Sequence, residues 1–150
     1  MSTIVCATRG GASSLAVQQQ AIERAREGDH RLIFLYVVDT TTFEGLDDSL
    51  VPAVSSELGW IGATLLNIAK NRAEAHDVEA ETQIRHGVLR GEIEALLTEE
   101  SADLLLLGTP RGTTRTVFGD DAIERFADSV SEATGVEVKL VRAEEVTDIW

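Results

Sequence analysis

Runs of consecutive apolar, β-prone residues constrain the fold of this chain more than any other feature. Residues 31–38 (Arg-Leu-Ile-Phe-Leu-Tyr-Val-Val) and 103–107 (Asp-Leu-Leu-Leu-Leu) form two such runs, and residues 3–8 form a shorter third. A strand that is apolar on both faces has to be covered on both faces, which is the pattern of a parallel sheet between layers of helices. The sequence therefore predicts an α/β fold.

Segments with helical spacing of apolar residues separate these strands. They cover residues 15–25, 58–73, 92–100 and 123–130, with Gly28 and Gly135 as the expected helix stops. Residues 39–54 are predicted to be a long polar connection, either a loop or a partly ordered cover over a site. The inward face expected for the second helix consists of Leu58, Ile61, Leu65, Ile68, Ala69 and Ala73.

Two further segments alternate between apolar and polar residues. Residues 78–84 alternate with period two, which indicates an edge strand with one exposed face, and residues 136–140 form a fifth strand in the same way. The resulting order βαβαβαβαβ predicts a doubly wound, Rossmann-like parallel sheet with helices on both faces and right-handed crossovers.

The charge of the chain excludes several classes of partner. Its 150 residues fit one domain and carry a formal net charge of −13, which disfavours nucleic acid and anionic membrane surfaces. Only two of the thirteen basic residues are lysines, a balance that favours a salt-rich cytoplasm such as that of a halophilic archaeon. No signal peptide and no apolar run of about 20 residues is recognised, and the single cysteine, Cys6, fits a reducing compartment. We therefore expect a cytoplasmic location.

Two loops have the composition of a ligand site. Residues 8–14 (Thr-Arg-Gly-Gly-Ala-Ser-Ser) follow the first strand, and residues 108–119 (Gly-Thr-Pro-Arg-Gly-Thr-Thr-Arg-Thr-Val-Phe-Gly) follow the fourth. Doubly wound sheets bind ligands at the carboxyl ends of their strands, where strand order reverses. Glycines allow the backbone to approach a ligand, and a helix N-terminus offers N–H groups to an anion. The second loop matches neither a P-loop nor the dinucleotide-binding fingerprint.

Four segments carry a resemblance to a known family. They are Ile4-Val-Cys-Ala-Thr8, Leu35-Tyr-Val-Val-Asp39, Gly87-Val-Leu-Arg-Gly-Glu-Ile93 and Ala102-Asp-Leu-Leu-Leu-Leu-Gly-Thr109. Over about residues 2–142 the chain resembles the universal stress protein family, which leaves residues 143–150, ending in Trp150, as an acidic tail. The resemblance implies a five-stranded parallel sheet of order 3-2-1-4-5. It also implies a homodimer, commonly paired through the fifth strand (Val136, Val138 and Leu140), and ATP binding in some members.

The chain departs from the pattern of the ATP-binding members at three points. The first is Arg9, which stands where those members have an aspartate. The second is the loop, in which Gly108 and Gly112 are one residue too far apart and the stretch to Gly119 is shorter. The third is Asp120, which replaces a serine or threonine. At the start of the last helix its carboxylate would cap the N–H groups that a phosphate would use. ATP binding in the usual mode is therefore not expected.

The charge pattern leaves open a differently posed anion. Residues 106–119 carry two arginines and no acid. Arg9, Arg111 and Arg115 suit bidentate recognition of a carboxylate or phosphate, although they could instead pair with Asp39, Asp120 and Asp121. The predicted pocket residues are Thr8, Arg9, Gly10, Val38, Asp39, Gly108, Thr109, Arg111, Gly112, Arg115, Gly119 and Asp120.

No arrangement in the sequence supports catalysis or a metal. His30, His76 and His86 are scattered without metal-ligand spacing, and Cys6 is expected to be an inert core residue. We therefore expect a non-enzymatic, homodimeric stress-response module without a metal or an assigned cofactor. The alternative is a protein that binds, and weakly hydrolyses, ATP or another nucleotide.

Overall fold

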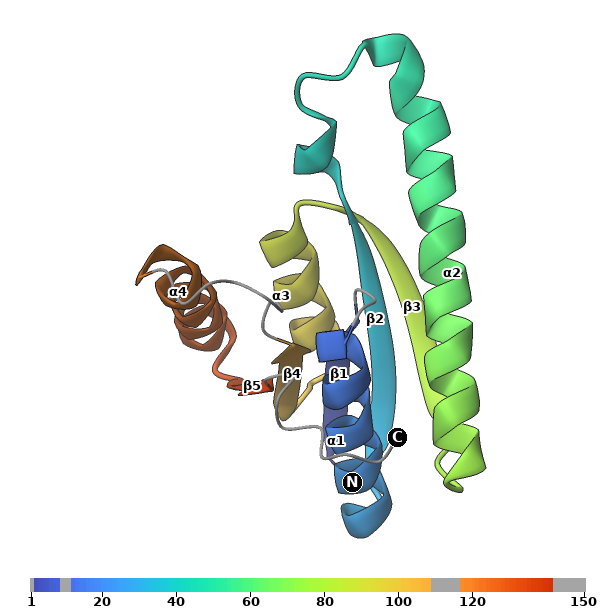
Figure 1. Ribbon diagram of the computed structural model, residues 1–150. Coiled ribbons are helices and arrows are strands. Elements are labelled where there is room, and N and C mark those ends of the chain that lie inside the picture. Colours follow the sequence, from blue (N-terminus) through green and yellow to red (C-terminus); the bar gives the residue numbers. More distant parts are fainter. Residues whose placement is uncertain (1, 9–11, 109–116, 142–150) are drawn as a thin grey trace.

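A parallel sheet of order β3-β2-β1-β4-β5 forms the centre of the molecule (Figure 1). The computed structural model describes residues 2–8, 12–108 and 117–141. The predicted order of strands and helices is confirmed. The elements are β1 (Thr3–Ala7), α1 (Ala12–Gly28), β2 (Arg31–Asp39), α2 (Val51–Ala75), β3 (Ala80–Gly87), α3 (Leu89–Glu99), β4 (Leu104–Gly108), α4 (Val117–Thr134) and β5 (Glu137–Val141), with two short 3₁₀ turns, η1 (Thr40–Phe43) and η2 (Asp48–Leu50).

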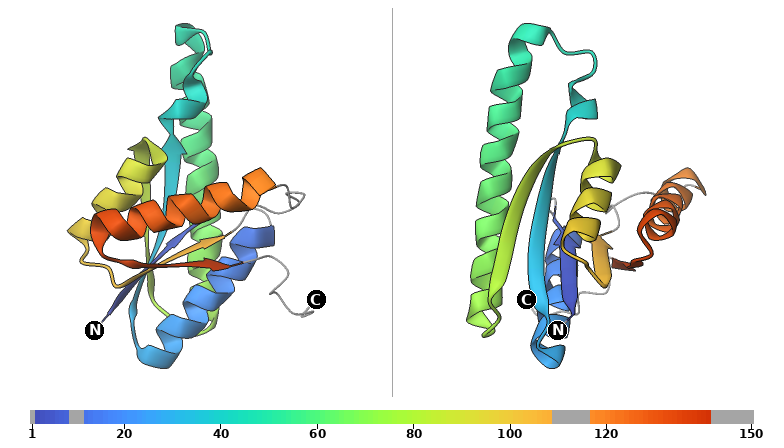
Figure 2. Two further views of the ribbon diagram at one scale, coloured as in Figure 1. Left: turned by 90° about the vertical axis from the view of Figure 1, so that its left-hand side faces the viewer. Right: turned by 180° about the vertical axis from the view of Figure 1, so that it is seen from behind.

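Helices cover the sheet on both faces (Figure 2). Leu32 and Phe34 of β2 pack in one core with residues of α1 and α2, while Ile33 and Leu35 pack in a second core with α3 and α4. Because successive side chains of a strand point to opposite faces, the apolar run of β2 fills both cores. Leu104 to Leu107 of β4 do the same. This explains why these two runs lack the alternation of a half-exposed strand.

The register of the strands aligns their carboxyl ends. Ala7 at the end of β1 pairs with Leu35 of β2 and with Leu107 of β4. The chain therefore leaves β1 and β4 at one level, directly beside β2. This places the starts of both predicted ligand loops, Thr8 and Gly108, next to each other.

The two segments with alternating apolar and polar residues, 78–84 and 136–140, form strands at the two edges of the sheet. Among the residues that the structure describes, β3 pairs only with β2 and β5 only with β4. Exposed residues on β3, such as Glu81 and Thr82, follow the buried Ala80. The expectation of an edge strand at residues 78–84 is confirmed, with β3 itself beginning at Ala80.

Helix α2 differs most from the prediction. It begins at Val51, with Pro52 in its first turn, so residues 51–54 belong to the helix and not to the polar connection. The remaining connection contains η1 and η2, which begin after Asp39 and Asp47; each carboxylate accepts a hydrogen bond from the backbone two residues later. These Asx turns order a segment that composition alone presents as a loop.

The predicted inward face of α2 was wrong in part. Gly62, Leu66, Ala69 and Ala73 are buried, whereas the side chains of Ile61 and Ile68 are 41% and 42% exposed. The reason lies at Gly62, against which the Tyr36 ring of β2 packs so closely that no β-carbon fits. The helix is therefore turned by one residue, about 100°, from the face that the large apolar residues indicate.

The two predicted helix stops have different outcomes. Gly135 has φ 75 and ends α4 as predicted, with its N–H donating to the Ser131 carbonyl at 2.7 Å. The prediction for Gly28 was wrong, because it is the last residue of α1 and Asp29, with φ 53, takes the left-handed position. Position 28 favours glycine for another reason, because a β-carbon there would overlap the His30 ring.

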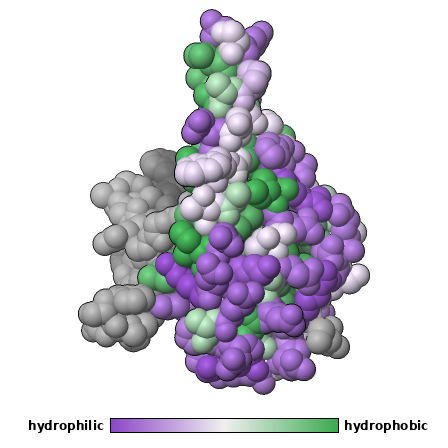
Figure 3. Space-filling view, turned by 90° about the vertical axis from the view of Figure 1, so that its right-hand side faces the viewer, coloured by the Kyte–Doolittle hydropathy of each residue, from purple (hydrophilic) through white to green (hydrophobic). Residues whose placement is uncertain are grey.

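One described segment, residues 48–75, is long and apolar enough by length and composition to cross a membrane. The core helices of other α/β proteins can meet the same criterion, and α2 packs through Gly62 and Leu66 on the sheet, so it is an element of this fold. Only 11% of its most apolar window is buried, however. Figure 3 shows the resulting apolar patches on this side of the molecule.

Two glycine substitutions in α2 should change the free energy of unfolding in opposite directions. Gly62→Ala forces the Tyr36 ring to move, an overpacking cost of about 1–3 kcal/mol. Gly59→Ala meets nothing closer than His86 Nε2 at 3.8 Å, so the higher helix propensity of alanine should stabilise the protein by up to about 1 kcal/mol. Urea midpoints measure both, and a rise for Gly62→Ala would contradict the packing described.

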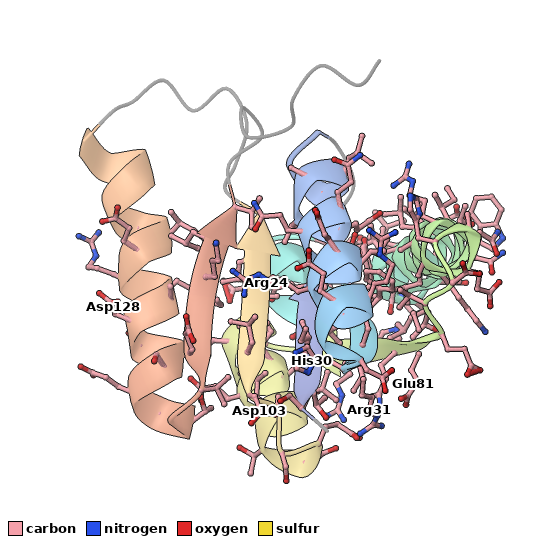
Figure 4. The ribbon with its side chains drawn as sticks, turned by 90° about the horizontal axis from the view of Figure 1, so that it is seen from below. Arg24, His30, Arg31, Glu81, Asp103 and Asp128 are labelled. Atoms are coloured by element: carbon pink, nitrogen blue, oxygen red, sulfur yellow. The ribbon has the colours of Figure 1, made fainter. Side chains whose placement is uncertain are left out.

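Arg31 joins two carboxylates at the amino end of the sheet (Figure 4). Its Nε lies 2.5 Å from Glu81 Oε2, and its Nη1 lies 2.7 Å from Glu100 Oε1. The hydrogen bond from Arg31 lowers the pKa of Glu81 below its ordinary value. The stabilisation from this pair is therefore complete above the ordinary glutamate pKa of about 4.3 and is lost as the pH falls through the lower, folded-state value.

This linkage predicts a small pH-dependent difference between two variants. Because Glu81 is half exposed, the pair should contribute at most about 1 kcal/mol. Glu81→Gln should remove this contribution at pH 7, and its deficit relative to the unmodified protein should shrink toward pH 3. Glu79→Gln is the control, since Glu79 makes no ion pair within the described residues. Urea unfolding across pH 3–7 measures this, and an equal deficit at every pH would refute it.

Candidate functional site

A cavity of about 250 Å³ lies at the carboxyl ends of β1, β2 and β4, on the face covered by α3 and α4. It occupies the switch point, where the chain crosses from one side of β1 to the other. The residues that line it are Ala7, Thr8, Leu35, Val37, Leu89, Ile93, Leu107, Gly108, Ala122, Ile123 and Phe126.

Three elements shape this cavity from different sides. The sheet contributes its floor, through the paired residues Ala7, Leu35 and Leu107. The first turns of α3 contribute Leu89 and Ile93, and α4 contributes the face that carries Ile123 and Phe126. Since α3 and α4 both follow strands of the same sheet, their amino-terminal halves meet above the strand ends. The cavity is therefore built into the topology.

Among the described residues that line the cavity, Thr8 has the only polar side chain. Thr8 is 1% exposed, and its Oγ1 accepts a hydrogen bond of 2.8 Å from Nε2 of Gln18. Oε1 of Gln18 in turn accepts from Nη1 of Arg72 at 2.7 Å. A chain of hydrogen bonds, buried at Thr8 and Gln18 and exposed at Arg72, thus runs from the cavity through α1 to α2.

The structure brings together only some of the residues predicted for the pocket. Thr8 and Gly108 line the cavity. Val38 is buried but does not line the cavity, because the side chain of Val37 points to the cavity face of the sheet and that of Val38 points to the opposite face. The Asp39 carboxylate accepts hydrogen bonds from Thr41, at 3.0 Å from its N–H and 2.8 Å from its hydroxyl, and so begins η1.

Gly119 and Asp120 lie in the first turn of α4, which begins at Val117. Asp120 is thus the fourth residue of this helix and not the residue that precedes it, because the helix begins earlier than its apolar face indicates. Its side chain and that of Asp121 lie outside the described part of the chain. The predicted residues Arg9, Gly10, Thr109, Arg111, Gly112 and Arg115 also lie outside it.

Most of the lining was not predicted as a site. Ile93, Ile123 and Phe126 were recognised only as the apolar faces of their helices. A helical residue that borders a cavity has the same spacing in sequence as one that fills the core, so periodicity does not separate the two. The available signal was position, since all three lie in the amino-terminal halves of helices that follow strands at the switch point.

The remaining titratable candidates are placed elsewhere. Cys6 is fully buried in mid-strand, and burial raises the pKa of its thiol well above the ordinary range, which agrees with an inert core residue. Nδ1 of His76 lies 2.9 Å from the Arg72 carbonyl at the end of α2. In the part of the chain that the structure describes, no three His, Cys, Asp or Glu residues are grouped as metal ligands would be.

Comparison with known proteins gives consistent matches. The model of the universal stress protein family matches residues 1–143. Universal stress protein MJ0531 of Methanocaldococcus jannaschii is 34% identical over 107 residues, which are 71% of this chain and 63% of that protein. The chain therefore matches somewhat less than two thirds of the length of this curated relative.

Solved structures share the fold at low sequence identity. UspA from Lactobacillus plantarum has a TM-score of 0.76 at 19% identity, covering 94% of this chain and 97% of that one. A universal stress protein in complex with cAMP has a TM-score of 0.69 at 22% identity, with coverage of 93% and 96%. An Arabidopsis thaliana protein with AMP bound has a TM-score of 0.68 at 15% identity, with coverage of 99% and 97%.

Substitutions at Thr8 test the buried hydrogen bond at the cavity. Thr8→Val keeps the shape but leaves the Gln18 amide without its acceptor in a buried position, which should lower the free energy of unfolding by about 1–3 kcal/mol. Thr8→Ser retains the oxygen and should lose clearly less stability. Urea unfolding of both variants measures the difference, and equal losses would show that the hydrogen bond contributes nothing beyond packing.

Proposed function

Because the chain belongs to the universal stress protein family, we propose that it is a non-enzymatic regulatory module that responds to a small anionic ligand. The ligand would place an apolar ring in the cavity and its charge at the adjoining loops, as a nucleoside monophosphate or cyclic nucleotide does. Relatives of the same fold have been solved with cAMP and with AMP. ATP held in the manner of the ATP-binding members is not part of this proposal.

The cavity is the observation that carries the proposal. It is bounded by the carboxyl ends of three strands, and seven of its lining residues contribute aliphatic or aromatic side chains larger than that of alanine. Ligand sites of this kind are predominantly apolar with a few placed polar groups. Thr8 supplies one such group among the described lining residues.

The charge of the flanking loops supports an anionic ligand. Residues 106–119 carry Arg111 and Arg115 and no acid, within a chain whose net charge is −13. The first loop adds Arg9. Guanidinium groups bind phosphate in bidentate fashion. Asp120 adds a negative formal charge to the first turn of α4, so the sequence favours a ligand with one phosphate over one with three.

The lining also supports binding in preference to catalysis. None of the described residues that line the cavity has a titratable side chain. General acid–base or nucleophilic chemistry requires a group that can transfer a proton or attack within reach of the substrate. We therefore propose a module whose output is a change of association or conformation, with weak nucleotide hydrolysis as the competing expectation.

The exposed edge at β5 supports a homodimer formed through this strand. Within the described residues, β5 pairs with β4 and forms one edge of the sheet. Val138 and Leu140 are half-buried, and Val136 and Val141 are buried. An edge strand with apolar side chains can be covered by the same strand of a second copy.

The balance of acidic to basic residues and the buried, unpaired thiol of Cys6 support a location in a salt-rich, reducing cytoplasm. This part of the proposal predicts that the protein keeps its folded state in molar KCl.

Calorimetric titration in molar KCl tests the ligand class. AMP and cyclic AMP should bind, ATP should bind more weakly than AMP, and inorganic phosphate should bind weakly because it leaves the apolar cavity empty. Absence of binding by all four compounds would overturn the proposal. Release of ADP or phosphate during overnight incubation with ATP would replace it with the hydrolytic alternative.

Two pairs of variants locate the ligand. Ala122→Trp places a large ring at the cavity and should abolish AMP binding, whereas Ala133→Trp, an exposed position of the same helix, should not. Arg111→Ala should weaken binding about 10- to 100-fold through loss of a charge-assisted hydrogen bond, while Arg125→Ala on α4 should leave it unchanged. Equal effects within either pair would place the ligand elsewhere.

A further inference from the structure

Helix α2 carries an uncharged surface in a strongly charged chain. From Leu50 to Ala69 the only charged residue is Glu57, although 26% of the whole chain is charged. Trp60 is 69% exposed, and Leu50, which immediately precedes the helix, is 51% exposed. Figure 3 shows this surface as apolar patches between hydrophilic regions. Contiguous exposed apolar surface of this kind marks an interaction site.

The apolar residues follow the spacing of a coiled coil. Val51, Val54, Leu58, Ile61, Leu65 and Ile68 are separated alternately by three and four residues, which is the a/d pattern of about three heptads. We call these six residues the seam. They differ from the residues that α2 buries on its own sheet, which are Gly62, Leu66, Ala69 and Ala73. The strongest apolar pattern of the helix is therefore left half-buried or exposed by the fold.

The first half of α2 has little cover of its own. None of its residues from Val51 to Ile61 is buried, and the helix extends beyond the strand ends together with η1 and η2 (Figures 1 and 2). A helix of 25 residues is about 37 Å long. It is thus long enough to pack along a second helix over its whole length.

The residues beside the seam allow close approach of a second helix. The open flank consists of Glu57, Thr64 and Asn71, of which two are uncharged, while on the other flank Gly62 and Ala69 are already covered by the sheet. Two copies of a chain with a net charge of −13 repel each other over most of their surface, so a neutral strip is where they can meet at the lowest electrostatic cost.

We propose that the seam is a homotypic interface, in which α2 packs antiparallel against α2 of a second copy. The charges on the line of the seam favour this direction. Asp47 lies on this line before α2 and Arg72 lies on it after Ile68, whereas Lys70 and Glu74 lie off it. Antiparallel packing brings Asp47 of one copy near Arg72 of the other, while parallel packing would place the two Asp47 carboxylates near each other.

This arrangement also covers the protruding half of each helix. With the two-fold axis near Ile61, Val54 of one copy lies opposite Ile68 of the other. The first half of each α2 then packs on the second half of its partner, which is held against its own sheet. The interface lies on the β3 side of the sheet, away from β5, so it does not compete with β5 for the same surface.

A charge-matched pair of double variants tests the interface. Ile61→Glu with Ile68→Glu changes the seam, and Ala63→Glu with Asn67→Glu changes exposed positions on the other side of the same helix. Light scattering after size-exclusion chromatography in molar KCl should give half the mass for the seam variant and an unchanged mass for its control. Circular dichroism and urea midpoints should show that both remain folded.

A third variant separates this proposal from the β5 dimer. Leu140→Glu should disrupt pairing through β5 and leave the seam interface intact. If Leu140→Glu alone yields a monomer and the seam variant keeps the mass of the unmodified protein, the seam proposal is overturned and the β5 interface stands. The seam proposal is also overturned if the seam variant keeps the mass of the unmodified protein but no longer binds vesicles of neutral phosphatidylcholine. That result would assign the surface to lipid.

Cysteine substitution tests the direction of packing, because the native Cys6 is fully buried. In the antiparallel arrangement, mixed Val54→Cys and Ile68→Cys proteins should form a disulfide-linked heterodimer, and neither alone should link to itself. Self-linking of each variant alone would show parallel packing and overturn the antiparallel assignment. Absence of any link would overturn the interface itself.

Discussion

The pairing of β1 with both β2 and β4 is the interaction on which the rest of the molecule depends. Its short apolar run is buried on both faces and lies at the centre of the sheet. Because Ala7 is level with Leu35 and Leu107, the chain leaves β1 and β4 at adjacent points. The helices that follow, α1 and α4, lie on opposite faces of the sheet. The position of the cavity follows from this divergence.

The sequence was sufficient for the strands and for α3 because their patterns have one physical solution. An uninterrupted apolar run requires cover on both faces, and Ile93, Leu96 and Leu97 have no other face to bury. Helix α2 was different. Its large apolar residues indicated one face, but the contact between the Tyr36 ring and Gly62 selected another. That contact joins two separate elements, and the local sequence around neither residue predicts it.

The site, like the fold, was predictable only in part. Thr8 and Gly108 followed from the rule that ligands bind at the carboxyl ends of parallel strands. Val38 was misplaced by one residue, and one residue in a strand is enough to move a side chain to the other face. Phe126 and Ile123 could not be assigned to the cavity, since apolar residues have the same spacing in a helix whether their side chains border a cavity or fill the core.

The cavity and the seam are two uncharged surfaces in a chain that is otherwise acidic, and two hydrogen bonds connect them. Thr8 lines the cavity, Gln18 binds it, and Arg72 binds Gln18 from α2, where it occupies the next heptad position after Ile68. The bond between Thr8 and Gln18 is buried, so breaking it would leave an unpaired polar group inside the protein. A ligand that contacts Thr8 therefore acts on a group whose partner is bonded to α2. If the proposed interface forms along α2, occupancy of the cavity and formation of the interface can each alter the free energy of the other.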